Sequence, residues 1–191
     1  GGPHDVSMTG LAVLAFLGAG HTERAGQYRD NVQRGVYWLI KQMKDDGRWN
    51  SNNYEQGIAA MALAEAAGMA RVPSTREAAQ KAIDGVIAGQ HEYAAWNYTP
   101  SPDTNARNDS SVSGWNVMAL KSAKIGGLKV DHKGFAGAIA WLDAGQDLTG
   151  AENAGSDYEG GRMSYAGTLQ VPNKGKGSIA VTASAAMQRL F

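Results

Sequence analysis

The chain has 191 residues, enough for one domain with a sizeable core, and its 18 Lys and Arg balance 18 Asp and Glu. With zero net charge and no basic stripe, no nucleic-acid partner is expected. The absence of cysteine excludes disulfides, cysteine nucleophiles and thiolate zinc sites. The longest apolar run, residues 11–17, is too short to span a membrane, so we expect a soluble protein whose compartment stays open.

A short polar segment recurs along the chain and marks a structural repeat. It begins at Asp5, Asn52, Asp109 and Ser178. The repeats predicted from it cover residues 5–50, 52–100, 108–167 and 177–191, and we expect them to form a single domain over residues 1–191. The long segments at residues 97–108 and 147–161 are interpreted as loops, the second solvated rather than calcium-binding.

Each repeat opens with a helix that is apolar nearly all round, which predicts burial on most sides. These inner helices begin after the polar segments, at residues 11, 58, 115 and 179. Gly18, Gly68 and Gly126 are expected to end the first three, because glycine adopts a left-handed cap without penalty.

An amphipathic helix follows in each complete repeat. Its apolar stripe lies in residues 32–43, 79–87 and 135–142, with charged residues on the opposite face. A buried helix followed by an amphipathic helix, three times over, predicts an all-α fold with an inner and an outer layer.

The first amphipathic helix and the turn after it carry a motif of a basic residue, small residues, aromatics and a glutamine. Its members are Arg34, Gly35, Tyr37, Gln42, Gly47 and Trp49. Weaker copies pair Gln90 with Trp96, and Gln146 with Met163. The motif resembles the QW repeat of squalene–hopene cyclases and related prenyltransferase/squalene-oxidase repeat proteins. The resemblance implies an α/α toroid, partial or complete, built from helical hairpins, with Gln42 packed on Trp49.

The resemblance also directs attention to Asp109. Cyclases of this family protonate an alkene with an Asp at the start of an inner helix, and Asp109 with Ser111 is the nearest match here. The second Asp of the bacterial pattern is absent. Asp5 and Asn52 occupy the same place in their repeats, and Asp and Asn are preferred helix N-caps. We therefore favour capping over catalysis for Asp109, and expect its carboxylate to accept from backbone N–H groups near Ser111 or Val112.

Aromatic and acidic side chains could line the concave face of such a toroid, where rings stabilise carbocations by cation–π attraction. The aromatic candidates are Tyr54, Trp96, Tyr98, Trp115, Tyr158 and Tyr165. Glu55 and Glu65 are expected to face inward and to be held by hydrogen bonds, because an unpaired buried acid is costly. No metal or cofactor is expected, since the four histidines do not pair at metal-helix spacing and we assign them surface or capping roles.

Two functions remain open at this point. One is a ligand- or protein-binding scaffold without catalysis, which we favour because the acid motif is incomplete. The other is a terpenoid cyclase acting on an isoprenoid chain, with Asp109 as the proton donor. The small-molecule partner expected for either function is an apolar or isoprenoid ligand, and the scaffold could instead bind a protein.

The chain begins at Gly1 without a methionine, which leaves open whether it is a fragment of a longer protein. An arc of four inner helices would leave the apolar side of the last one, residues 179–191, uncovered, which predicts self-association there or a continuation of the chain.

Overall fold

The computed structural model describes residues 2, 4–50, 52–101, 103, 105–147, 162–170, 172 and 179–189. Within them the chain is dominated by α-helices, which confirms the all-α class. The helices are α1 (Asp5–Gly18), α2 (Arg29–Gln42), α3 (Asn53–Ala70), α4 (Pro73–Ala88), α5 (Ser110–Ile125), α6 (His132–Gly145) and α7 (Ile179–Arg189). In the described part of the chain, no helix is both long enough and apolar enough to cross a membrane.

Two short antiparallel pairs of strands accompany the helices. β1 (Asn108–Asp109) pairs with β4 (Ala166–Gly167), and β2 (Gln146–Asp147) pairs with β3 (Arg162–Met163). The second pair sets Gln146 opposite Met163, the two residues matched to the glutamine and tryptophan of the motif. Most of the 147–161 loop, together with Tyr158, Ser178, Leu190 and Phe191, lies outside the described residues.

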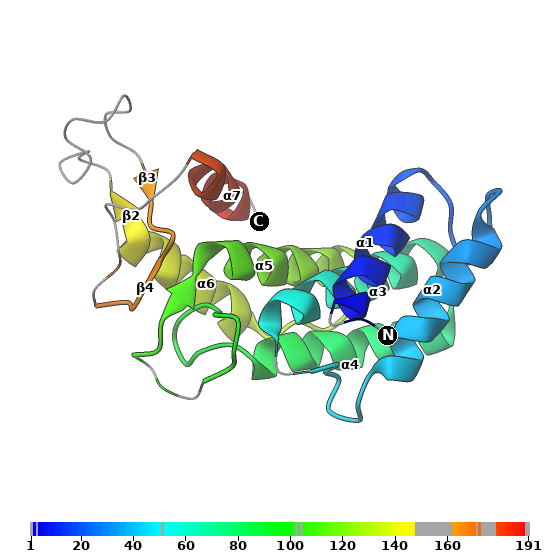
Figure 1. Ribbon diagram of the computed structural model, residues 1–191, viewed down its shortest axis with the longest axis horizontal. Helices are drawn as coiled ribbons and strands as arrows, with labels where there is room; N and C mark the ends of the chain where they lie inside the picture. The colour runs from blue at the N-terminus through cyan, green and yellow to red at the C-terminus, as the bar shows by residue number, and fades with distance from the viewer. Residues whose placement is uncertain are drawn as a thin grey trace.

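The odd-numbered helices pack in sequence, α1 on α3, α3 on α5 and α5 on α7. Each of the first three also contacts the helix that follows it, so that α2, α4 and α6 flank the row (Figure 1). This is the alternation of inner and outer helices predicted from the sequence. The closure of the helices into a toroid remains a prediction.

Helix α3 occupies the middle of the core because small residues cover most of its surface. Its described alanines at 59, 60, 62, 64, 66 and 67 are all fully buried. A Cβ added to Gly57 would lie 3.0 Å from Cβ of Trp115, and one added to Gly10 would lie 3.0 Å from Cγ2 of Ile58. Glycine at these two positions therefore lets α1, α3 and α5 approach one another closely.

Two details of the inner helices differ from the prediction. Gly68 does not end α3. A Cβ added to Gly68 would lie 3.3 Å from Cα of Gly126, so this glycine serves a close contact with the end of α5. The helix continues to Ala70 and is capped by Arg71 at a φ of 52°. Helix α1 begins at Asp5 itself, and the Asp5 carboxylate accepts a hydrogen bond from Gly2 N at 2.6 Å.

A third difference concerns burial. Helix α1 was expected to be buried on most sides, but its buried residues are only Ser7, Gly10, Val13 and Leu17. Met8 is 63% exposed and Leu11 is 38% exposed. The apolar pattern of α1 is the same as that of α3, but α3 lies between two inner helices and α1 beside one.

Candidate functional site

Asp109 is the N-cap of α5 and is fully buried. Its Oδ1 accepts from Ser111 N at 3.0 Å, from Ser111 Oγ at 2.6 Å and from Val112 N at 3.2 Å. Its Oδ2 faces Nη2 of Arg107 at 3.2 Å. These contacts confirm the predicted capping role. Both carboxylate oxygens of Asp109 therefore accept hydrogen bonds from the chain itself.

Asn52 performs the same task for α3. Its side-chain oxygen accepts from Tyr54 N at 2.9 Å and from Glu55 N at 3.4 Å. The next residue, Asn53, joins α3 to the loop that carries Tyr98, since Asn53 N donates to Tyr98 O at 2.8 Å. Its Nδ2 donates to Asn97 O at 2.9 Å. The N-terminal end of α3 thereby fixes the position of Tyr98.

Three of the predicted aromatic residues gather beside these two helix starts. The rings of Tyr54 and Tyr98 lie parallel with centroids 5.9 Å apart, and the Trp115 ring meets Tyr54 edge-on at 6.2 Å. We call Tyr54, Tyr98 and Trp115 the aromatic cluster. Tyr98 is 43% exposed and the other two rings are half-buried, so the cluster offers apolar area to a ligand.

The surroundings of Tyr98 perturb its phenol. Burial raises the pKa of Tyr98, the carboxylate of Asp109 and the nearby Tyr165 raise it further, and a hydrogen bond with Ser111 opposes them. Tyr165 comes close because Ser110 N donates to Tyr165 O at 2.9 Å, next to the β1–β4 pair. The neutral phenol is therefore the favoured form beside the α5 cap.

Trp96, another of the aromatic candidates for the concave face, lies in the core instead. It is fully buried, and its indole Nε1 donates to Val86 O at 2.9 Å. Trp49 repeats this contact in the first repeat, with Nε1 donating to Leu39 O at 2.7 Å. Each indole thus ties a turn back to the last part of the preceding outer helix, which is a structural role.

Glu55 is also held by structural contacts, as expected. Its carboxylate is 3.1 Å from Nδ1 of His4 and accepts from Asn50 Nδ2 at 2.7 Å. It lines a small cavity of about 260 Å³ together with Gln42 and Trp49. Glu65, the other inward acid, accepts from Ser122 Oγ at 2.6 Å.

The glutamines of the motif differ in their surroundings. Gln42 is exposed and lines the same cavity as Trp49, and the packing of the two side chains stays a prediction. Gln90 does bridge to the next outer helix, donating to Ala94 O at 2.8 Å and to Gly134 O at 3.0 Å. Gln56, a residue that the motif did not indicate, makes a comparable bridge from the turn of the first repeat to α4 by donating to Gly47 O and Ala82 O, each at 3.0 Å.

The other motif residues serve the helix packing or face solvent. A Cβ on Gly35 would lie 2.6 Å from Cγ2 of Val13, so Gly35 allows α2 to approach α1. Gly47 is buried in the turn at a φ of 78°. Arg34 and Tyr37 are exposed on α2.

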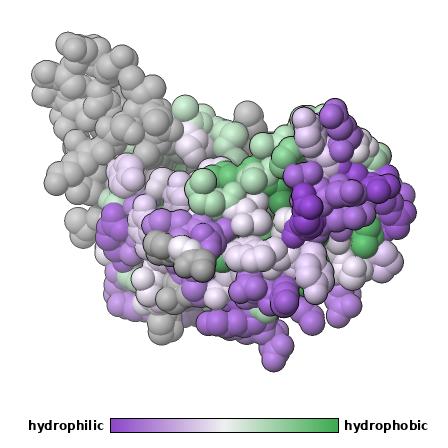
Figure 2. Space-filling view, turned by 45° about the vertical axis from the view of Figure 1, so that its right-hand side comes forward, coloured by the Kyte–Doolittle hydropathy of each residue, from purple (hydrophilic) through white to green (hydrophobic). Residues whose placement is uncertain are grey.

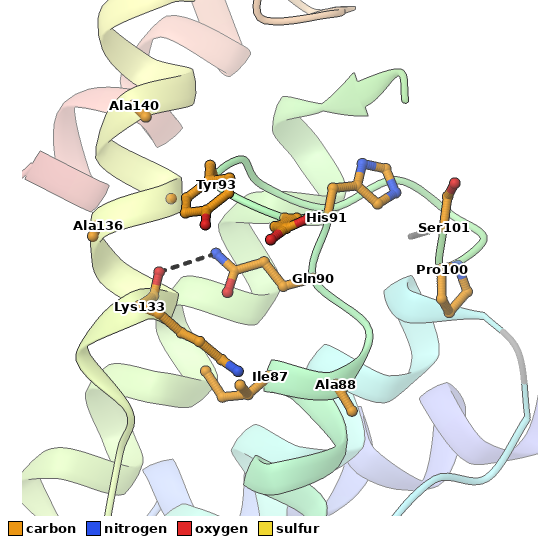
Figure 3. Close-up of a pocket in the computed structure, with 12 residues that line it drawn as sticks. Ile87, Ala88, Gln90, His91, Tyr93, Pro100, Ser101, Lys133, Ala136 and Ala140 are labelled. Carbon is orange, nitrogen blue, oxygen red and sulfur yellow. Dashed lines mark hydrogen bonds between the residues drawn. The ribbon is translucent and has the colours of Figure 1, made fainter. Parts of the chain in front are cut away.

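A groove of about 890 Å³ opens between the end of α4, the following loop and α6 (Figure 3). Small and apolar residues form much of its wall, and Gln90 reaches across it toward α6. His91 lines it but is 1% exposed, which contradicts the surface role, one of the two roles predicted for the histidines. Its Nδ1 is 3.2 Å from Asn108 Oδ1, an oxygen that also accepts from Ala95 N, so Nδ1 is the donor in this contact.

No group of three or more possible metal ligands occurs among the residues that the structure describes. The chain matches no protein-family model, no curated protein and no solved structure. The site must therefore be interpreted from its own geometry.

Proposed function

We propose that this chain is a ligand-binding scaffold of the squalene-cyclase-like repeat type, without catalysis, and that the aromatic cluster holds an apolar or isoprenoid chain. The observation that carries the proposal is that both carboxylate oxygens of Asp109 accept hydrogen bonds from the chain itself. Protonation of an alkene requires an acid whose proton points into a dry apolar pocket. Asp109 instead uses both oxygens to cap α5 and to bind Arg107.

The aromatic cluster has the apolar surface that a site for an apolar ligand requires. Its rings combine apolar faces with partial exposure, and aromatic faces contribute most of the affinity in small-molecule sites. Met61 lies two helical turns beyond Tyr54 on α3, and Met118 lies one turn beyond Trp115 on α5; both are partly exposed. Flexible methionine side chains adapt to an irregular apolar chain. We infer that a ligand runs from the aromatic cluster along these two helices.

The experiment is a titration of the chain with farnesol, monitored by tryptophan fluorescence because Trp115 lies in the cluster. Tyr98→Ala should weaken binding about tenfold, since an aromatic contact contributes about 0.5–1.5 kcal/mol beyond its buried area. The matched control is Tyr37→Ala, because Tyr37 is 65% exposed on α2, and it should leave the affinity unchanged.

Equal affinity in the Tyr98→Ala and wild-type chains would contradict the assignment of the cluster. Conversion of squalene to a cyclic product by the wild-type chain, lost in Asp109→Asn, would establish the cyclase alternative in place of the scaffold.

A further inference from the structure

Helix α1 exposes an apolar flank that its sister helices bury. The flank consists of Met8, Leu11, Ala12 and Ala15, all of which are exposed. In Figure 2, hydrophobic residues also gather on the upper central part of the face shown, bordered by hydrophilic ones. A run of exposed apolar residues on one side of a helix marks a contact surface.

The packing between the other inner helices indicates what the exposed flank of α1 contacts. A Cβ on Gly57 of α3 would lie 3.0 Å from both Cβ of Trp115 and N of Asn116, so the next inner helix receives this glycine at those two positions. A Cβ on Gly10 would meet Ile58 at 3.0 Å and Ala59 at 3.3 Å in the same way.

The receiving positions are thus the first and second residues after the glycine of each inner helix. In α1 these are Leu11 and Ala12. In α3 the equivalent Ile58 and Ala59 are fully buried by α1, whereas Leu11 is 38% exposed. Among the described residues, no inner helix therefore packs a small residue onto these two positions of α1.

Helix α7 carries the complementary half of this contact. In the polar segment of the fourth repeat, Ala183 stands where Gly10 and Gly57 stand in the others. Ala185, at the second receiving position, is 6% exposed, in keeping with the packing of α7 on α5. Ala183 itself is exposed. At one end of the row of inner helices, α7 thus exposes a small residue at the glycine position. At the other end, α1 exposes the two positions on which such a residue packs.

We propose that two copies of this chain associate head to tail, with the Ala183 side of α7 in one copy packed on the Leu11–Ala12 flank of α1 in the next. Small residues allow the close approach that Gly10 and Gly57 provide inside the chain. The two surfaces are different, so the contact is heterologous and extends the copies into a ring or an open chain.

Cysteine cross-linking tests the contact directly, because the chain contains no cysteine. Ala12→Cys and Ala183→Cys are prepared as single variants and treated with a short bifunctional maleimide. A head-to-tail contact gives cross-linked dimers when the two variants are mixed, and none from either variant alone. The double variant should give a series of higher species.

Light scattering supplies the second measurement. Leu11→Arg should convert the wild-type oligomer to monomer, whereas Tyr37→Arg on α2 should leave the oligomer intact. Three results would overturn the proposal: a wild-type monomer at high concentration, a dimer formed by Ala12→Cys alone, and a double variant that cross-links only within one chain. The last would mean that α7 closes on α1 in the same molecule.

Discussion

The indole of Trp96 ties the turn after α4 to the end of that helix, and its removal tests the repeated contact. The side chain is fully buried and its Nε1 donates to Val86 O at 2.9 Å. Val86 O also accepts from Gly89 N at 3.2 Å, so it keeps one partner when the indole is lost. Trp96→Phe should therefore cost about 1–2 kcal/mol, near the net value of one hydrogen bond with a small change in packing.

Trp96→Ala removes the ring as well and should cost about 3–5 kcal/mol, as for other large-to-small substitutions of buried aromatics. Trp49→Ala should cost about 3 kcal/mol or more, because Trp49 is 6% exposed and makes the equivalent bond to Leu39 O. The assay is urea unfolding monitored by far-UV circular dichroism. The dependence of the free energy of unfolding on urea concentration should be the same in all variants.

The exposed Tyr37→Ala is the control and should change the free energy of unfolding by no more than about 0.5 kcal/mol. A loss below about 1 kcal/mol for Trp96→Ala or Trp49→Ala would refute the structural role of these indoles.

Three further predictions concern single positions. Asp109→Ala should lower the free energy of unfolding by about 1–2 kcal/mol while Asp109→Asn keeps most of the capping, and equal losses in urea melts would contradict the N-cap role. Burial raises the pKa of Glu23 above 4.5 against the hydrogen bond from Thr75, so this group stabilises the fold below about pH 4.5, and that contribution is lost as pH rises through the raised value. Glu23→Gln should flatten the fall of the melting temperature above that pH, and an unchanged profile would count against it. Gly47→Ala should cost at least about 1 kcal/mol in the same urea assay, because Gly47 has a φ of 78° and a Cβ there would collide with Lys81 O; a neutral effect would show that the turn adapts.

The sequence predicted the parts of this fold that depend on local pattern. Apolar spacing identified the inner and outer helices, and the recurrence of Asp and Asn at helix starts identified the Asp109 cap. Chemical logic also predicted that Glu55 would be paired, since a buried carboxylate without partners is costly. Each of these conclusions needs only residues that are close in sequence, or a cost that holds in any fold.

The errors arose where a side chain's direction depends on distant contacts. Trp96 was a candidate for the concave face because a sequence does not distinguish core aromatic residues from pocket-lining ones. Both Trp49 and Trp96 follow their carbonyl partners by ten residues, a spacing that the sequence does contain. His91 was predicted to have a surface or capping role, and its burial was missed because its partner Asn108 lies across a loop. The exposed flank of α1 escaped prediction because its apolar pattern matches that of a buried helix.

The most direct test of the scaffold account is to identify the ligand after binding. The chain is incubated with farnesol, separated from free ligand by gel filtration and extracted for gas chromatography with mass spectrometry. The account predicts unchanged farnesol bound to the wild-type chain and to Asp109→Asn alike, and little bound to Tyr98→Ala. A cyclised product from the wild-type chain that is missing from Asp109→Asn, or the absence of bound farnesol from the wild-type chain, would contradict it.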